Sequence, residues 1–226
     1  MSQQSAIELH YWNIRGLCEP IKTLLEYLHL DYKVFYKDNA DAMKQEKQKL
    51  IDEGFLFANL PYIKDGDRYL SETFAILVYL ARKAKRLDLV FNEEESADFL
   101  ETMGVLSDFK SMVTNVFYAK KTVEEVKAQL AEVKNRIWSK INAFGKILSK
   151  QDFVFKRITI LDFYLAELID MIRCFQKEQN FDLLGEFNDV YLQFLNRIYE
   201  IPEIKNYHDS DKFFDRPYNN FMAAWK

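Results

Sequence analysis

Two kinds of hydrophobic pattern divide this chain of 226 residues, and the change between them constrains its fold. Up to about Lys83, short segments in which apolar and polar residues alternate are mixed with segments of helical spacing. Beyond Lys83 the alternating segments disappear and helical spacing remains. Alternation is typical of a half-buried strand, and helical spacing is typical of an amphipathic helix. The sequence therefore predicts an α/β domain over residues 1–85, followed by an all-helical domain over residues 86–226.

The patterns in the first domain predict the element order βαβαββα. Ile7 to Trp12 alternates, and Glu19 to Leu28 has one apolar helical face with a proline in its first turn. Residues 33–36 are β-branched and aromatic, as in a strand. Asp65-Gly66 is a hairpin signal between two further short strands. The segment after Ser71 is again helical in pattern.

Capping signals predict long helices in the second domain. Residues 93–118 have apolar side chains at helical spacing. Thr122 with Glu125 is a capping box at the start of a second long helix. Thr159 with Asp162 has the same pattern ahead of a helix over residues 160–175. We expect Thr159 and Asp162 to act in folding rather than in catalysis.

Composition excludes several classes of protein. Hydrophobic residues make up 49% and charged residues 29%, which is ordinary for a globular protein. The net charge of -4 gives no reason to expect nucleic acid or an anionic membrane as a partner. No apolar run is long enough to span a membrane, and the polar start shows no secretory leader. Cys18 and Cys174 make no disulfide framework. We therefore expect a cytoplasmic protein.

Four short strings follow one another in a fixed order. They are Tyr11–Leu17, Asn59–Tyr62, Ala75–Lys83, and Arg216-Pro217 with Trp225. Together they resemble the cytosolic glutathione S-transferases, most closely the tyrosine-type mu class and its sigma and alpha relatives. The resemblance covers the chain from about Ile7 to Trp225. It implies a thioredoxin-like first domain that binds glutathione, and a helical second domain that carries the electrophile pocket and dimer contacts.

The chemistry of this family needs a thiolate. A free thiol has a pKa of about 8.5 and is only slightly ionised at neutral pH. A hydroxyl that donates a hydrogen bond to sulfur stabilises the anion and lowers that pKa. The resemblance gives this role to Tyr11. The pattern alone supports a second interpretation, a core tyrosine on the same face as Ile7 and Leu9.

The resemblance also implies the other contacts to glutathione. It implies a cis peptide before Pro61 that turns the Leu60 backbone toward the cysteinyl part; the alternative is a simple strand-entry proline. Glu72 would bind the γ-glutamyl ammonium, and Thr73 with the helix start its carboxylate; the alternative is N-terminal capping. The predicted glutathione site comprises Tyr11, Trp12, Leu17, Lys47, Lys49, Asn59, Leu60, Pro61, Glu72, Thr73 and Asp108. Glutathione is a co-substrate here, and no tightly bound cofactor or metal is predicted.

One segment departs from the mu pattern. Between Tyr36 and Phe55 the chain is several residues shorter than in a mu enzyme and has no tryptophan. It contains the charged run Lys44–Lys49 instead, in which Lys47 or Lys49 is a candidate for the glycine carboxylate of glutathione. Such a run is more often a solvated helix face.

Asp108 and Tyr118 lie ten residues apart. This spacing resembles that of the mu-class aspartate that reaches the partner's glutathione and the tyrosine that assists the electrophile. Asp98 competes for the first role, and Tyr118 has a second interpretation as an interfacial aromatic. The predicted electrophile pocket comprises Trp12, Leu17, Thr114, Tyr118 and Asn219.

Phe57 corresponds to a phenylalanine that inserts between helices of the partner subunit in this family, which predicts a homodimer. Cys18 is predicted to be a packing residue. The leading function is conjugation of glutathione to electrophilic small molecules. The alternatives are a sigma-like isomerase and a non-catalytic module for dimerisation or for a larger assembly.

Overall fold

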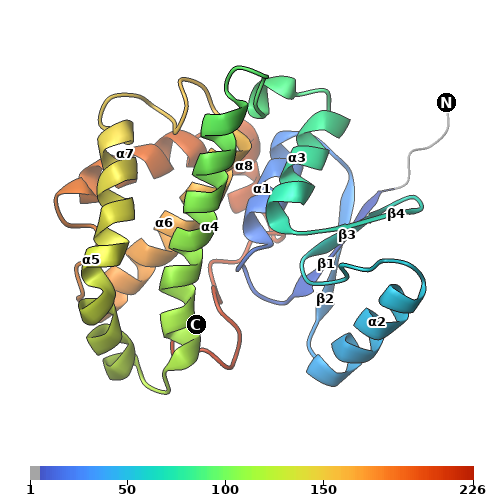
Figure 1. Ribbon diagram of the computed structural model, residues 1–226, viewed down its shortest axis with the longest axis horizontal. Helices are drawn as coiled ribbons and strands as arrows, with labels where there is room; N and C mark the ends of the chain where they lie inside the picture. The colour runs from blue at the N-terminus through green and yellow to red at the C-terminus, as the bar shows by residue number, and fades with distance from the viewer. Residues whose placement is uncertain (1–5) are drawn as a thin grey trace.

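The computed structural model describes residues 6–226, and the first five residues of the polar start lie outside them. The first part has the predicted order, shown in blue to teal in Figure 1. Its elements are β1 (Ile7–Trp12), α1 (Glu19–Tyr27), β2 (Tyr32–Lys37), α2 (Ala40–Asp52), β3 (Tyr62–Asp65), β4 (Arg68–Ser71) and α3 (Thr73–Lys83).

The remainder of the described chain is helical, as predicted. Its elements are η1 (Leu87–Leu89), α4 (Ser96–Ala119), α5 (Val123–Leu148), α6 (Ile160–Gln179), η2 (Gly185–Phe187), α7 (Asn188–Tyr199) and α8 (Pro202–His208). Several predicted boundaries were wrong, two of them by three or more residues. Helix α4 begins at Ser96 rather than Glu93, and α6 continues to Gln179, where Asn180 adopts a left-handed conformation with φ of 47°.

The four strands form one mixed sheet in the order β2-β1-β3-β4. Strand β1 is parallel to β2 and antiparallel to β3, with Leu9 opposite both Val34 and Ile63. The hairpin predicted at Asp65-Gly66 joins β3 and β4, and Gly66 has the positive φ of 60° that favours glycine. Side chains alternate along β1, so Leu9 enters the main core while His10 stacks on Tyr62.

Helix α6 is the centre of the second part. It contacts α1, α3, α4 and α7, and most of its residues are buried. Asp162 confirms the capping prediction, because its carboxylate accepts hydrogen bonds of 2.7 Å from the amides of Thr159 and Val154. Burial raises the pKa of Asp162 to about 7, against the lowering effect of these hydrogen bonds. These hydrogen bonds fix the start of α6 beside the hydrophobic core, to which both parts of the chain contribute.

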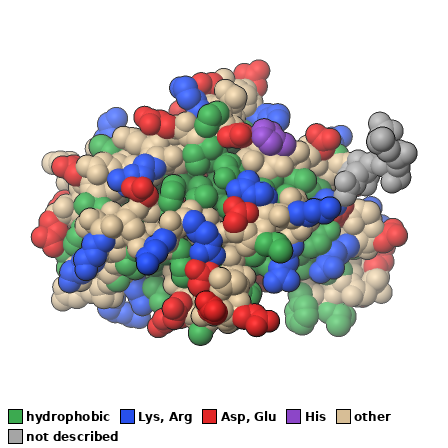
Figure 2. Space-filling model, turned by 90° about the horizontal axis from the view of Figure 1, so that it is seen from above, with side chains coloured by type: hydrophobic (Ala, Val, Ile, Leu, Met, Phe, Trp, Pro, Cys, Tyr) green, Lys and Arg blue, Asp and Glu red, His purple; other side chains and the backbone are tan. Residues whose placement is uncertain are grey.

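The surface is of mixed charge on the face in Figure 2, where acidic and basic side chains are interspersed among small apolar groups. Within residues 6–226, no helix combines the length and the apolar character needed to cross a membrane.

Candidate functional site

Tyr11 lies near the end of β1, and the loop that follows wraps around its hydroxyl. The side chain is buried, and its oxygen accepts a hydrogen bond of 3.0 Å from the backbone N–H of Leu17. Burial raises the pKa of Tyr11, although the Leu17 hydrogen bond opposes this. The phenol therefore keeps its proton at neutral pH, and it donates that proton to no group among residues 6–226.

The loop needs a glycine where it passes the phenol. Gly16 has a φ of +47°, and a Cβ built there would lie 2.6 Å from the Tyr11 hydroxyl oxygen. Any side chain at this position would be strained and would displace the phenol. Gly16 belongs to the Tyr11–Leu17 string and to a turn that is plausible at Arg15-Gly16, and the structural reason for a glycine there is this close approach.

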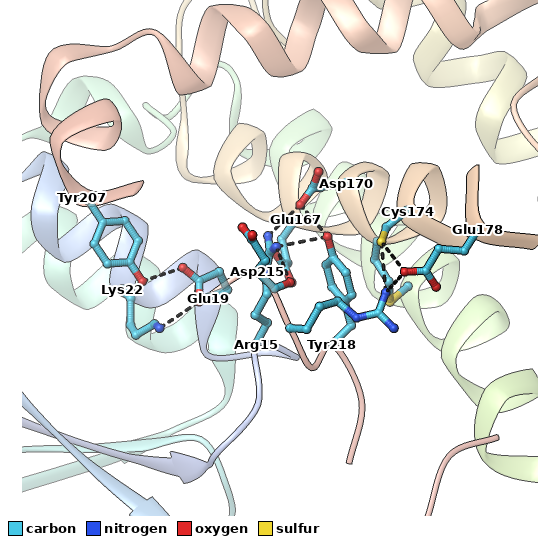
Figure 3. Close-up of polar contacts among 12 residues, drawn as sticks. Arg15, Glu19, Lys22, Glu167, Asp170, Cys174, Glu178, Tyr207, Asp215 and Tyr218 are labelled. Carbon is cyan, nitrogen blue, oxygen red and sulfur yellow. Dashed lines mark hydrogen bonds and ion pairs between the residues drawn. The ribbon is translucent and has the colours of Figure 1, made fainter. Parts of the chain in front are cut away.

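Arg15 anchors the same loop to the second part of the molecule (Figure 3). Its guanidinium lies 2.6 Å from the Glu167 carboxylate and 2.8 Å from that of Asp170, both on α6. It also donates to the hydroxyl of Tyr218 at 3.0 Å. Burial alone would lower the pKa of Arg15, but the two carboxylates outweigh it and raise that pKa. The tail joins in through Pro217, whose carbonyl accepts from the Arg15 amide.

Thr73 meets Tyr11 through Leu17. The Thr73 hydroxyl donates to the Leu17 carbonyl at 3.4 Å, while the Leu17 amide donates to Tyr11. Glu72 precedes α3 with φ of 70° and is exposed, and its side chain makes no capping hydrogen bond. Capping was the alternative role for Glu72, and the structure contradicts it. A non-glycine residue in this backbone region carries strain, which is most often found at functional sites.

The Asn59–Pro61 segment enters β3. The peptide between Leu60 and Pro61 is cis, as the resemblance implies. Asn59 is exposed, Leu60 is half-buried and Pro61 is buried. Leu60 packs against the small cluster of buried side chains under α2, and so does Trp12.

Lys47 and Lys49 of α2 make no hydrogen bond with Tyr11, Leu60 or Thr73. Lys47 is exposed, and Lys49 is exposed and lies 3.7 Å from Glu53 on its own helix. The charged run thus forms a solvated helix face, which was the alternative interpretation. A contact of either lysine with a glycine carboxylate stays a prediction.

Tyr118 is hydrogen-bonded to the C-terminal tail. Its hydroxyl accepts a hydrogen bond of 3.1 Å from the amide of Asn220, and 38% of the residue is exposed. Burial raises the pKa of Tyr118. Thr114, one turn earlier, donates its hydroxyl to the carbonyl of Lys110 within α4.

A cavity of about 320 Å³ brings two of the predicted electrophile-pocket residues together. Trp12 and Asn219 both line it, but Leu17, Thr114 and Tyr118 do not. The Asn219 side chain is buried and donates to the carbonyl of Trp225. A single electrophile pocket that also includes Leu17, Thr114 and Tyr118 stays a prediction. The other residues that line the cavity include Ile14, Ala40, Pro217, Phe221 and Met222.

Asp108 lies on another face of α4. It is exposed and lines a groove of about 420 Å³ between α4 and α5, with Met112 and Arg136 among its neighbours. Within one protomer it therefore does not meet Tyr11. Asp98 is exposed in the first turn of the same helix.

Phe57 and Cys18 differ in their exposure to solvent. Phe57 is 81% exposed in the loop before β3. Cys18 is fully buried at the start of α1, and burial raises the pKa of its thiol. A buried thiol with a raised pKa is inert, in agreement with the predicted packing role.

Several buried charged residues were not singled out from the sequence. Besides Arg15 and its carboxylates, Lys22 lies 2.9 Å from Glu19, which accepts a hydrogen bond from Tyr207. Lys110 is buried in α4, where its ammonium contacts the sulfur of Met171 at 3.8 Å. Glu19 and Lys22 lie three positions apart on α1, but their neighbour Tyr207 and the Met171 partner of Lys110 lie far along the chain, where no local spacing marks them.

Comparisons with known proteins agree with this geometry. The model of the glutathione S-transferase N-terminal domain matches residues 7–82, and that of the C-terminal domain matches residues 107–211. Among curated proteins, glutathione S-transferase Mu 3 of Macaca fuscata fuscata is 30% identical over 230 residues, covering 100% of this chain and 97% of that protein. Glutathione S-transferase Mu 2 of Mus musculus is 28% identical, covering 96% of this chain and 97% of that protein.

A solved structure is similar over the same length. The crystal structure of the glutathione S-transferase Blo t 8 has a TM-score of 0.79 and 27% identity, covering 96% of this chain and 98% of that one. Both domain models and full-length relatives therefore point to one conclusion. This chain belongs to the glutathione S-transferase family of enzymes, alongside relatives of the mu class.

Proposed function

We propose that this enzyme stabilises the thiolate of glutathione with the hydroxyl of Tyr11 and conjugates it to electrophilic small molecules. The observation that carries the proposal is the hydrogen bonding of the Tyr11 hydroxyl. Its oxygen accepts from the Leu17 amide, and its proton has no acceptor among residues 6–226. A hydroxyl so placed can donate to a sulfur anion, and this hydrogen bond favours the ionised thiol.

Glutathione would lie across the first part of the chain, over residues 1–85. The Leu60 backbone would hold the cysteinyl unit beside Tyr11. The γ-glutamyl end would meet Glu72, Thr73 and the start of α3, where free backbone N–H groups attract a carboxylate. The strained backbone of Glu72 supports this placement, since its side chain serves no capping role.

The reaction needs no proton transfer from Tyr11. The thiolate attacks an electrophilic carbon, a carbon–sulfur bond forms, and the electron pair leaves with the departing group or moves onto the activated double bond. Tyr11 holds the thiolate before attack, and the second part, over residues 86–226, helps to bind the electrophile. Trp12 and Asn219 line a cavity with enough apolar wall for such a molecule.

A homodimer in the cytoplasm completes the proposal. Phe57 is 81% exposed, which leaves an apolar ring in water unless a partner covers it. Asp108 faces the α4–α5 groove, away from its own Tyr11, so it would reach only a partner's glutathione.

The test compares wild type with Tyr11→Phe in conjugation of glutathione to an activated chloroarene. We expect the rate at neutral pH to fall by about tenfold or more, with glutathione binding by calorimetry unchanged. Equal rates in the two proteins would refute the role of Tyr11. Absence of both conjugation and glutathione binding in wild type would refute the whole proposal.

A further inference from the structure

Helix α2 has few apolar contacts with the sheet. Of its residues only Met43 and Leu50 are buried, and with Ala58 and Tyr62 they form a cluster separate from the main core. Figure 1 shows α2 at the rim of the molecule, beside one end of the sheet. Because apolar stabilisation scales with the area removed from water, this small cluster contributes little to the packing of α2 against the sheet. The position of α2 then depends on its polar contacts.

Glu46 supplies the polar contact between α2 and the sheet. Its Oε1 accepts a hydrogen bond of 2.5 Å from the hydroxyl of Tyr62 on β3. Lys37, at the end of β2, donates to both carboxylate oxygens at 2.8 and 2.7 Å. Hydrogen bonds to an ionised carboxylate are shorter and stronger than those between neutral groups. Burial alone would raise the pKa of Glu46, but these bonds outweigh it and keep the pKa low.

The partners of Glu46 are themselves held in place. The ring of Tyr62 stacks on His10 at 4.3 Å between centroids, and His10 stacks on Phe35 at 4.8 Å. His10 Nδ1 lies 3.9 Å from Glu46 Oε1. Glu46 therefore bonds α2 to β2 through Lys37 and to β3 through Tyr62, and the stacked ring of His10 on β1 supports Tyr62.

The same part of the structure borders the proposed glutathione site. The cluster under α2 packs against Trp12 and Leu60, which flank Tyr11 and Pro61 in the chain. Lys37 and Ala40 line the cavity that also contains Trp12. A shift of α2 would therefore move Trp12 and Leu60, two residues of the proposed glutathione site.

We propose that Glu46 is a positioning residue for glutathione, which acts by holding α2, and through it Trp12 and Leu60, against the sheet. The proposal rests on the proposed function. Glu46 itself touches neither glutathione nor the electrophile. Its effect is therefore on the binding of glutathione rather than on the chemical step.

The test is steady-state kinetics of Glu46→Gln with glutathione varied at saturating electrophile. This variant keeps the shape of the Glu46 side chain and removes the negative charge to which Lys37 and Tyr62 donate hydrogen bonds. We expect the KM for glutathione to rise about tenfold, while kcat stays within about twofold. Lys37→Met, which removes the partner on β2, should raise this KM as well.

The matched control is Asp52→Asn, which removes an acidic charge from an exposed position on the same helix. Its KM should equal that of wild type. An unchanged KM in Glu46→Gln, or a fall in kcat alone, would overturn the proposal. Absence of glutathione binding in wild type would overturn the proposed function as well. Failure of the Glu46 proposal alone is therefore distinguishable from failure of the proposed function.

Hydrogen exchange gives a readout that does not depend on activity. In protein without glutathione, amides of residues 40–52 should exchange faster in Glu46→Gln than in Asp52→Asn, while those of α1 and α6 stay as in wild type. Equal exchange over α2 in the two variants would overturn the anchoring role. Faster exchange throughout the chain would show general destabilisation and overturn it too.

Discussion

The guanidinium of Arg15 lies 2.6 Å from the carboxylate of Glu167, and both side chains are almost fully buried. This ion pair joins the loop that holds Tyr11 to helix α6, across 152 positions of the chain. The tail adds Tyr218, which donates to Asp170 at 2.8 Å. The position of the Tyr11 loop therefore depends on the second part of the molecule as well as on the sheet.

Replacing Arg15 by methionine should destabilise the fold by about 3–5 kcal/mol, because it leaves the Glu167 carboxylate buried without its partner. Urea unfolding at neutral pH measures this change. The control is Lys205→Met, which breaks an exposed pair with Asp209 at 3.6 Å and should cost less than about 1 kcal/mol. A cost for Arg15→Met no larger than that of the control would contradict the assignment.

The elements that could be predicted from the sequence are those fixed by neighbouring residues. The alternation from Ile7 to Trp12 gave β1 with its bounds, and Asp65-Gly66 gave the hairpin. Thr159 with Asp162 marked the start of α6, because a capping box involves only four adjacent residues. In each case the interaction that forms the element lies within a few positions of the chain.

The residues that could not be predicted depend on distant partners. Arg15 contacts Glu167 and Tyr218, and nothing near it in the chain distinguishes it from a surface arginine. The path of the tail was equally hidden, and it brings Asn219 to the cavity that Trp12 also lines. The resemblance could supply Tyr11 and Pro61, but the hydrogen bond to the phenol comes from the backbone amide of Leu17, which no side-chain pattern marks.

Lys110→Met should stabilise the protein at pH 7 by about 1–4 kcal/mol, because it replaces a poorly paired buried charge with an apolar side chain of similar length. Burial lowers the pKa of Lys110 to about 8. The unfolded chain keeps this proton up to its ordinary pKa, so wild-type stability gains from Lys110 as pH rises above 8.

The measurement is the difference in unfolding free energy between Lys110→Met and wild type from pH 7 to pH 10. The advantage of the variant should shrink as pH rises through 8 toward 10. Because Lys110 lowers the pKa of the Glu167 carboxyl, the difference reports Lys110 together with this one neighbour. A stability advantage of Lys110→Met that is constant with pH would contradict the lowered pKa of the buried Lys110 side chain.

Gly16→Ala should remove most of the conjugation activity, since the added Cβ would meet the Tyr11 hydroxyl at 2.6 Å. The positive φ should also cost about 1–2 kcal/mol of stability. Gly66→Ala is the matched control, because Gly66 has φ of +60° but open space around it. Urea unfolding should show a loss of stability in both variants, larger in Gly16→Ala because of its added contact with Tyr11. Conjugation assays should show a loss of activity in Gly16→Ala alone. Equal activity in the two would mean that the phenol tolerates displacement.

Phe57→Ala should weaken the proposed homodimer. The ring is 81% exposed in one protomer, and burying a phenylalanine contributes about 1.5–3 kcal/mol. A twofold-symmetric interface would bury two such rings, so the dissociation constant should rise by at least about tenfold.

Sedimentation velocity over a range of protein concentrations measures that constant. The matched control is Leu56→Ala, which removes an adjacent apolar side chain that is 70% exposed. If Phe57 is the residue that inserts into the partner, its replacement should shift the dimer to monomer at concentrations where Leu56→Ala stays dimeric. Equal shifts in the two variants would show that the loop contributes only general apolar area. An unchanged dimer in Phe57→Ala would place the interface elsewhere, because a ring that leaves water on association cannot be deleted without cost.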